Sequence, residues 1–510
     1  YTDTLHYDYN IRGWLSGINK HYLNTTATSP GPGQYFGDEL DYDFGINQIQ
    51  LNGNIAGIKW KSAGDQQQRA YGYDYDNANR ILKGDFTQYT GSAWNTTQHI
   101  DFTTNNLTYD ANGNIQSMHQ NGLVVNASQP VDELKYTYAN SGYSNQLLSV
   151  KDSISQDNKL GDFTDGNTSD NDYAYDSNSN LTKDLNKGIT SIQYNYLNLP
   201  ETIDVIKTTD HTNKGMIKYV YDAAGNKLQK IITDSTTNPI NIDTTTYIGG
   251  FIYKDDTLQY IAHEEGRIKP KLINSSTGYT PSNINWIYDY YEKDHLGNVR
   301  MVLTEQKDTA IYVATMEQKY ATVENQLFDN VSSTQYPTPS GFDNPQDTSN
   351  HYVSRLNANS TVNKRAGPSL VLKVMAGDQV TASVYAWYNT ATQSPTGPSL
   401  LADLLSSLSG GVIDNSGGKL QPGQLTTVET GITPGVNQFL SYKDGQYNSS
   451  LPKAFLNWAL FDDQFNFVVG GVKQVTSSTS KQALVASIPT IPKNGYLYIY
   501  VSNESPQDVF

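Results

Sequence analysis

The side chains that could carry out acid–base or metal chemistry in this sequence are eight histidines and many carboxylates, and their spacing matches no standard catalytic site. His263-Glu-Glu-Gly-Arg267 lacks the second histidine of a helical zinc site. Ser416-Gly-Gly-Lys-Leu420 lacks the first glycine and the hydroxyl residue of a phosphate loop. Gly367-Pro-Ser369 and Gly397-Pro-Ser399 lack the second glycine of a nucleophile elbow. We therefore predict a non-enzymatic protein with no catalytic residues, cofactor or metal.

One acidic segment has the composition of a calcium-binding loop. Asp162-Phe-Thr-Asp-Gly-Asn-Thr-Ser-Asp-Asn-Asp172 offers several oxygen ligands of the kind that calcium prefers. Its spacing does not match the EF-hand loop, so we favour a solvated loop over a calcium site.

Composition points to an all-β protein of more than one domain. The 510 residues include no cysteine, which excludes disulfides and cysteine-based zinc sites, and 35 basic against 51 acidic residues give a net charge of −16. That charge predicts no nucleic-acid partner. Tyrosine (38) far outnumbers phenylalanine (14) and tryptophan (6), and tyrosine favours half-buried strands. No apolar run is long enough for a membrane span. The chain lacks an initial methionine and stops after a strand-like run, so we expect it to be a fragment.

An internal repeat shows where the sequence forms strands and turns. Gly-Asn pairs recur after Leu51, Ala111, Ala223 and His295, and three of them have an aspartate three residues before the glycine. The unit reads Tyr-x-Tyr-Asp-x-x-Gly-Asn-aliphatic, with degenerate copies at Tyr136-Thr-Tyr138 and Tyr194-Asn-Tyr196. The residues that define the motif are Tyr75, Asp76, Tyr109, Asp110, Gly113, Asn114, Tyr175, Asp176, Tyr221, Asp222, Gly225, Asn226, Asp294, His295, Gly297, Asn298 and Arg300.

Each unit predicts a β-hairpin. Alternating tyrosines place rings on one face of a strand, the aspartate bonds its own backbone to form a turn, and the glycine supplies a positive φ. A single hairpin is only marginally stable, but hairpins stacked side by side bury their aromatic faces in one sheet.

These units resemble YD repeats, and Asp294-His-Leu-Gly-Asn-Val-Arg300 resembles the signature of the RHS-repeat family, relatives of teneurins and of Tc toxin shell subunits. Tyr247–Tyr253, His263–Arg267 and Asn52–Trp60 resemble the Bacteroidota version. The resemblance covers roughly residues 1–305. It implies a β-sheet spiralled into a hollow shell that encloses a C-terminal toxin. The autoproteolytic segment and toxin of family members have no match before Phe510.

The remaining sequence predicts a second, different domain. We expect a repeat shell over 1–305, a connecting segment with the first sandwich strand or strands over 306–350, and a jelly-roll-like β-sandwich over 351–510, truncated at its C-terminus. Alternation predicts strands at 380–388 and 496–501, and apolar runs predict strands at 370–375 and 454–460. Leucines 400, 401, 404, 405 and 408 predict one short helix at 399–408. The module resembles one inserted after the signature in Bacteroidota RHS proteins, at Lys373–Asp378 and Pro452–Trp458.

The leading functional hypothesis is a structural, encapsulating shell of a secreted or surface-displayed bacterial protein. The resemblance implies that its partner is its own C-terminal toxin or other cargo, outside this chain, and that the secretion machinery is a further partner, through a type IX route by analogy. The alternative is a cell-surface adhesin in which the sandwich binds surface glycan through aromatic side chains, with Tyr385 and Trp387 as the stacking candidates. Because one face of every strand must face the core, we expect about half of these aromatic side chains to be core residues.

Overall fold

The computed structural model describes residues 4–25, 34–43, 47–97, 100–124, 127–154, 162–167, 171–273, 283–307, 309–342, 350–359, 362, 364–388, 400–402, 404–405, 425–476 and 480–510. Its chain divides into two compact units. Unit 1 comprises residues 1–62, 67–124 and 128–308, and unit 2 comprises 63–66, 125–127 and 309–510. None of the described helices is long and apolar enough to cross a membrane.

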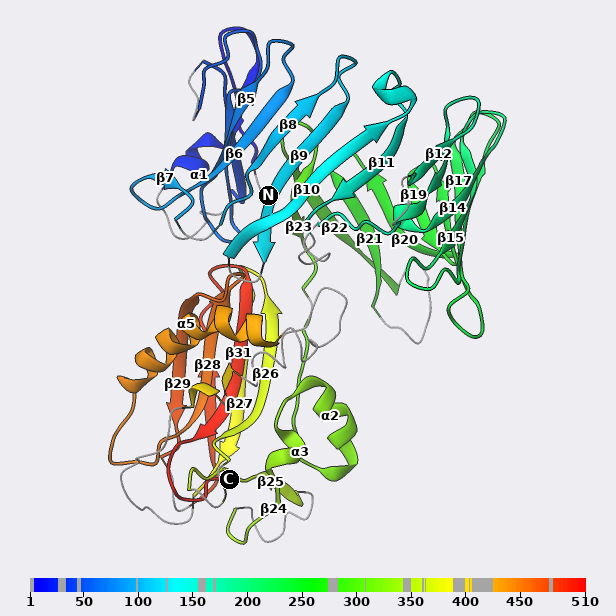
Figure 1. Ribbon diagram of the computed structural model, residues 1–510. Coiled ribbons are helices and arrows are strands. Elements are labelled where there is room, and N and C mark those ends of the chain that lie inside the picture. Colours follow the sequence, from blue (N-terminus) through cyan, green and yellow to red (C-terminus); the bar gives the residue numbers. More distant parts are fainter. Residues whose placement is uncertain are drawn as a thin grey trace. The chain divides into compact units, whose positions relative to one another are not determined.

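Unit 1 begins with an antiparallel sheet in which neighbours along the chain are almost always neighbours in space (Figure 1). A short helix, α1 (Lys20–Asn24), packs on β3 and β4. The strands of this first sheet are β1 (Tyr7–Tyr9), β2 (Leu15–Ile18), β3 (Phe36–Asp41), β4 (Gly57–Ser62), β5 (Arg69–Tyr75), β6 (Ile81–Tyr89), β7 (Trp94–Asn95), β8 (Thr104–Tyr109), β9 (Ile115–Val124), β10 (Ala127–Tyr138) and β11 (Leu147–Asp152).

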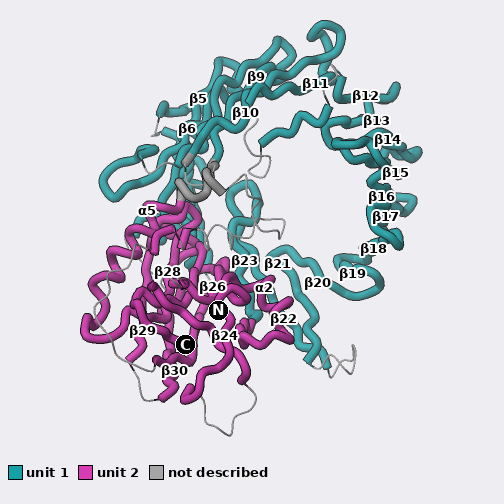
Figure 2. Tube along the Cα trace, turned by 60° about the horizontal axis from the view of Figure 1, so that its bottom comes forward, with its two compact units in different colours: residues 1–62, 67–124, 128–308 teal, residues 63–66, 125–127, 309–510 magenta. Residues whose placement is uncertain are grey.

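A second antiparallel sheet continues the same pattern, and every described strand in it pairs with the next one along the chain. Figure 2 shows the strands of unit 1 following one another around an arc. The strands are β12 (Tyr173–Tyr175), β13 (Leu181–Asp184), β14 (Ile189–Tyr194), β15 (Pro200–Ile206), β16 (Asn213–Tyr221), β17 (Lys227–Asp234), β18 (Asn241–Ile248), β19 (Phe251–Lys254), β20 (Thr257–His263), β21 (Gly266–Leu272), β22 (Ile284–Lys293) and β23 (Val299–Thr304).

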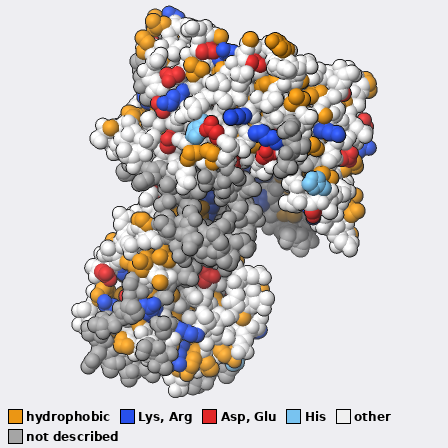
Figure 3. Space-filling view, viewed as in Figure 1, with side chains coloured by type: hydrophobic (Ala, Val, Ile, Leu, Met, Phe, Trp, Pro, Cys, Tyr) orange, Lys and Arg blue, Asp and Glu red, His pale blue; other side chains and the backbone are white. Residues whose placement is uncertain are grey.

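Alternation sorts the side chains of the first sheet onto two faces. Tyr71 lies opposite Phe86, and both contact Trp60 within 6.2 Å between ring centroids, so aromatic rings share one face. Figure 3 shows acidic and basic side chains interspersed on the face in view. The all-β prediction, with hairpins as its repeating element, is confirmed.

Unit 2 contains a four-stranded sheet, in the order β26-β31-β28-β29, and two pairs of strands, β27-β30 and β24-β25. Its elements are α2 (Ala321–Leu327), α3 (Val331–Thr334), β24 (Gln335–Pro337), β25 (Tyr352–Ser354), β26 (Ala366–Val374), β27 (Thr381–Ala386), α5 (Leu425–Asp444), β28 (Ala454–Asp462), β29 (Phe467–Gln474), β30 (Gln482–Ser487) and β31 (Gly495–Asn503).

Two apolar cores lie on opposite faces of the four-stranded sheet. Leu456 and Leu460 of β28 join Leu484 of β30 in one core, so two sheets face one another as the sandwich prediction requires. Ala459 and Phe461, on the other face of β28, join side chains of α5 in a second core. Burial on both faces explains why the β28 segment is apolar at most positions, and its buried Asn457 donates its side-chain amide to Ser502 at 3.0 Å.

The helices differ from the prediction. At the predicted helix over 399–408, Leu404 donates its backbone N–H to Leu400 at 3.0 Å, and both leucines are buried, while residues 399, 403 and 406–408 lie outside the described residues. Helix α5 was not predicted. It contains Pro434 and Gly435, which disfavour helices, yet a Cβ on Gly435 would lie 2.0 Å from the Phe465 carbonyl oxygen. Close packing on the sheet therefore overrides helix propensity here.

Candidate functional site

The turn of each repeat is held by its aspartate. The Asp222 Oδ1 atom accepts from the backbone N–H groups of Ala224 (2.9 Å) and Asn226 (2.8 Å), and Oδ2 accepts from the Asn226 side chain (2.8 Å). Hydrogen bonds from the Asn226 side chain and then its backbone lower the pKa of Asp222. The same arrangement is found at Asp76, Asp110, Asp176 and Asp294, with the Arg80 guanidinium in place of the asparagine amide at Asp76.

The third residue after each aspartate has a positive φ. It is glycine at Gly113 (89°), Gly225 and Gly297, but asparagine at Asn79 (62°) and serine at Ser179 (66°). The turn therefore needs the left-handed conformation rather than glycine itself, which explains why some copies of the motif lack the Gly-Asn pair.

The tyrosine that precedes the turn residue has a role that the sequence did not reveal. Its hydroxyl donates to a backbone carbonyl at the start of the return strand of an earlier hairpin, or, for Tyr75, to that of Ile55, two residues before β4. We call this series the tyrosine ladder. Its donor–acceptor pairs are Tyr42–Leu15 (3.0 Å), Tyr75–Ile55 (2.8 Å), Tyr109–Ile81 (2.6 Å), Tyr138–Ile115 (2.9 Å), Tyr175–Leu147 (3.1 Å), Tyr194–Leu181 (2.7 Å) and Tyr221–Pro200 (2.9 Å).

The ladder also crosses the junction between the two sheets of unit 1. Tyr175 of β12 reaches Leu147 of β11, and Asp172, which is fully buried, completes the junction. Asp172 Oδ2 accepts from the Val150 N–H (2.9 Å), and its own N–H donates to the Leu148 carbonyl (2.8 Å). This aspartate of the acidic segment is therefore structural.

The same acidic segment also supplies one member of a carboxylate cluster. Ligand atoms of Asp132, Asp152 and Asp162 lie within 4.8 Å of one another. Burial, and to a smaller extent the charge of Asp152, raise the pKa of Asp132, whose Oδ1 accepts from the Phe163 N–H at 2.8 Å. Carboxylates gather in this way without a cation as well, so the cluster does not by itself define a calcium site.

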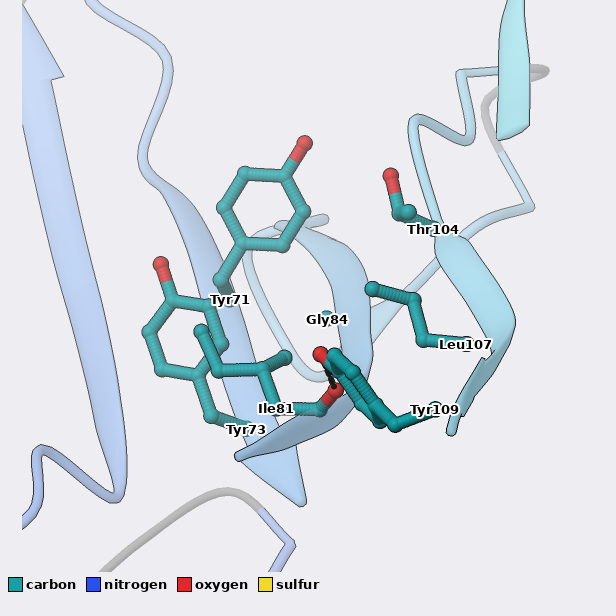
Figure 4. Close-up of a pocket in the computed structure, with 7 residues that line it drawn as sticks. All are labelled: Tyr71, Tyr73, Ile81, Gly84, Thr104, Leu107 and Tyr109. Atoms are coloured by element: carbon teal, nitrogen blue, oxygen red, sulfur yellow. Dashed lines mark hydrogen bonds between the residues drawn. The ribbon is translucent and has the colours of Figure 1, made fainter. Parts of the chain in front are cut away.

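A pocket of about 430 Å³ opens on the aromatic face of the first sheet. Gly84 of β6 forms its base, between Tyr71 and Tyr73 of β5 and the side chains of β8, Thr104, Leu107 and Tyr109 (Figure 4). The hydroxyls of Tyr71 and Tyr109 already donate to backbone carbonyls. The pocket therefore presents mostly aromatic and aliphatic surface, without the convergent acids or bases of an active site.

The last repeat turn lies against the start of the first sheet. Asp38 of β3 is fully buried, and its Oδ1 accepts from the Ile18 N–H at 2.9 Å, while Oδ2 has no hydrogen-bond partner among the described residues. Burial, with a smaller contribution from the charge of Asp294, raises the pKa of Asp38 to about 6 against the opposing effects of the Ile18 hydrogen bond, Arg300 and Lys20. Asp294 itself is neutralised by Arg300 at 2.6 Å.

His295 has the character of a packing residue. Burial lowers its pKa, and its Nδ1 atom is buried without a hydrogen-bond partner among the described residues. A catalytic histidine needs a neighbouring group that accepts or donates a proton, and neither is found at Nδ1.

The two glycan-stacking candidates do not form a joint platform. Tyr385 is 63% exposed on β27, but Trp387 is 7% exposed and packs against Phe342 and Phe510 in a small core. Residues two apart share a face only while a strand continues, and β27 ends at Ala386. Trp387 is therefore a core residue, and Tyr385 is the one member of the pair open to solvent.

No protein-family model matches the chain, and no curated protein matches it. Two solved structures that resemble it are TcdB2-TccC3 with Cdc42 (TM-score 0.33, 14% identity) and TcdB2-TccC3 (TM-score 0.35, 14% identity). They cover 59% and 58% of this chain, which spans only 16% and 15% of theirs. A porin-like protein from Bacteroides uniformis covers 50% at a TM-score of 0.17 and 10% identity.

Proposed function

We propose that this chain is a non-enzymatic, structural part of a shell that encloses a polypeptide cargo. The observation that carries the proposal is the tyrosine ladder, because it joins successive hairpins as far as Tyr221 of β16 and links both sheets of unit 1 through Tyr175, where Asp172 adds a further contact. A wall built from paired hairpins leaves few free edges for unwanted association. The pocket over Gly84 adds an apolar surface suited to side chains of a sequestered chain.

The identity of the wider protein belongs to the same proposal. On the Tyr-Asp units and the Asp294–Arg300 motif we assign the chain to RHS/YD-repeat proteins of the Bacteroidota type, which carry a C-terminal toxin and are secreted or surface-displayed, by type IX export. Fractionation of the producing bacterium tests this location. Protein confined to the cytoplasm after export has been allowed to proceed would contradict it.

Limited proteolysis of the complete natural protein tests encapsulation itself. We expect the cargo part to resist a protease that digests it at once in denaturant. The matched variant is Asp172→Ala, which removes the Val150 contact at the junction of the two sheets and leaves every tyrosine in place. It should speed cargo cleavage while β16 and β17 stay protected from hydrogen exchange. Equal cleavage of the cargo in the folded and denatured protein would overturn the proposal.

A further inference from the structure

Gly84 of β6 is a glycine that neither its backbone nor its neighbours require. Its φ lies outside the left-handed region, and a Cβ there would make only ordinary contacts, 3.5 Å from Tyr73 Cε1 and 3.6 Å from Tyr71 Cδ1. Two other strand glycines are needed by their surroundings, because a Cβ at Gly122 or Gly471 would lie 2.9 or 2.7 Å from a neighbouring side-chain atom. Glycine weakens the interior of a strand, and it often marks a place where a ligand approaches closely. What Gly84 provides is the space above it.

That space is a slot between two walls on one face of the sheet. Gly84 pairs with Tyr73 of β5 on one side and with Thr104 of β8 on the other. Two strand spacings, about 10 Å, therefore separate the backbones of the two walls. Figure 4 shows Tyr71 and Tyr73 on one side of Gly84, and Thr104 and Leu107 on the other. A side chain at position 84 would project into this pocket of about 430 Å³.

Aromatic rings form the wall on the β5 side, and their positions are fixed. The rings of Tyr71 and Tyr73 lie 6.0 Å apart with an interplanar angle of 15°, and Tyr71 also stacks on Trp60 at 5.6 Å. The Tyr71 hydroxyl is held by the Phe102 carbonyl at 3.0 Å. A wall that is already ordered loses little conformational freedom when a ligand binds.

Two hydroxyls of the pocket are open to a ligand. Those of Tyr73 and Thr104 make no hydrogen bond to any described residue, whereas those of Tyr71 and Tyr109 are engaged. Burial raises the pKa of Tyr73 to about 12, so its hydroxyl keeps its proton at neutral pH. The described residues that line the pocket include no charged side chain. The pocket therefore suits a neutral, mainly apolar ring with one polar group, whereas the many hydroxyls of a sugar would lack partners.

We propose that the slot over Gly84 is a binding site for a bicyclic aromatic molecule of the naphthol or indole class. The rings lie between the tyrosine wall and Leu107, and the hydroxyl or N–H of the ligand forms a hydrogen bond with the Tyr73 hydroxyl. A cavity of about 150 Å³ accommodates one benzene ring, so this larger, open pocket has room for two fused rings. The inference stands apart from encapsulation, because a free ligand tests it on the folded chain.

The experiment is a titration of the full chain with 2-naphthol, followed by the fluorescence of the ligand. We expect saturable binding at one site per chain. Tyr73→Phe keeps the ring and removes the hydroxyl, so it should weaken the binding of 2-naphthol about fivefold, the effect of one net hydrogen bond. The same variant should leave the displacement of 2-naphthol by naphthalene, relative to 2-naphthol's own affinity, correspondingly stronger, because naphthalene makes no such bond.

Matched variants on β6 test the slot itself. Gly84→Leu fills it and should abolish binding, whereas Lys83→Leu adds a leucine at the next position, on the opposite face of the strand, and should retain it. Gly84→Ala is a second variant in case Gly84→Leu disturbs folding. Its Cβ meets only ordinary contacts, and it should weaken binding several-fold.

The saturated analogue decahydro-2-naphthol tests the aromatic class, because it keeps the hydroxyl and the two-ring size. It should bind about fivefold more weakly, since it cannot stack on the tyrosines. Equal binding of the two would overturn the aromatic class. No saturable binding of 2-naphthol by the folded chain, or equal binding by Gly84→Leu and the unmodified chain, would overturn the site.

A competitor distinguishes two sources of the ring. Displacement of bound 2-naphthol by N-acetyltryptophanamide would show that a polypeptide side chain can supply the ring. Bound 2-naphthol that resists this competitor but is displaced by 3-methylindole would show that the ligand is a free small molecule. Both results would support the site.

Discussion

The two units use different means to hold β-strands together. All three clusters of buried apolar side chains among the described residues lie in unit 2, on the two faces of its four-stranded sheet and around Trp387. In unit 1, long strands such as β16 and β17 have mostly half-buried or exposed side chains. Hydrogen-bonded turns and the tyrosine ladder join them instead. Single apolar side chains such as Leu40 and Phe86 are buried in unit 1, but its strands depend more on polar contacts than those of unit 2 do.

One turn occurs in both units and isolates the contribution of the tyrosine. Asp462 accepts from the N–H groups of Gln464 (3.0 Å) and Asn466 (2.9 Å), and Phe465 has a φ of 59°, as in a repeat turn. The residue before it is Phe461, which is 1% exposed in an apolar core. The aspartate turn is thus a general hairpin device. The tyrosine before it is specific to the wall, where a hydroxyl must reach the neighbouring hairpin.

The largest effect is expected from Leu497→Ala in unit 2. Leu497 is fully buried in the core that β28, β30 and β31 share, and such truncations cost about 2–5 kcal/mol. Hydrogen exchange during a urea titration should show unit 2 opening earlier while unit 1 is unchanged. Val485→Ala, at a 49% exposed site on β30, is the control and should change the unfolding free energy of unit 2 by less than about 0.5 kcal/mol. An equal loss of protection in unit 1 would contradict the view that the two units are stabilised separately.

A somewhat smaller effect concerns pH and unit 1. The pKa of Asp38 rises from 3.8 to about 6 on folding, so the folded state holds the proton more tightly. Below 3.8 both states are protonated, and as pH rises toward 6 the folded state loses stability relative to the unfolded one. At about 1.4 kcal/mol per pKa unit, this loss is about 3 kcal/mol. In thermal melts between pH 4 and 7, unit 1 of the Asp38→Asn variant should not lose this stability as the pH rises. The same dependence of melting temperature on pH in the variant and the unmodified chain would contradict the prediction.

The tyrosine ladder makes a smaller contribution at each step. Tyr138→Phe leaves the Ile115 carbonyl without its donor and should destabilise unit 1 by about 1 kcal/mol. The control is Tyr143→Phe, because Tyr143 is 88% exposed, and it should change stability by less than about 0.5 kcal/mol. Urea titrations followed by exchange in β9 and β10 measure both. Equal midpoints for the two variants would mean that the ladder is not a source of stability.

The smallest effect is a local titration. Carboxyl carbon NMR should place the pKa of Asp222 below 3.8, because the Asn226 side chain and backbone donate to it. Its stabilising contribution is present above pH 3.8 and is lost as pH falls through the folded pKa. Asn226→Ala should move the pKa of Asp222 back toward 3.8, and Asn241→Ala, on another hairpin, should not. An unchanged value in Asn226→Ala would contradict the assigned cause.

Local chemistry made several features predictable from the sequence alone. Aspartate turns and alternating tyrosines predict hairpins, since both depend on residues close together in the chain. The alternation over 496–501 correctly places Tyr498 and Tyr500 on the face under α5 and Leu497 on the opposite core. The degenerate copy Tyr194-Asn-Tyr196 uses its first tyrosine in the ladder. Tyr194 belongs to the ladder, and Tyr196 is 80% exposed within the turn.

Features that depend on distant partners could not be predicted from the sequence. The ladder acceptors are backbone carbonyls, which carry no signal in the residue types. The burial of Asp38 depends on how the sheet folds, and its electrostatics on Asp294, 256 residues later (294 − 38). Trp387 enters a core because β27 ends one residue earlier. The formation of Tyr-Asp hairpins follows from the residue types alone, because hairpin turns are local. Which carbonyl each tyrosine reaches, and which edge stays open, are settled only when the strands are placed side by side.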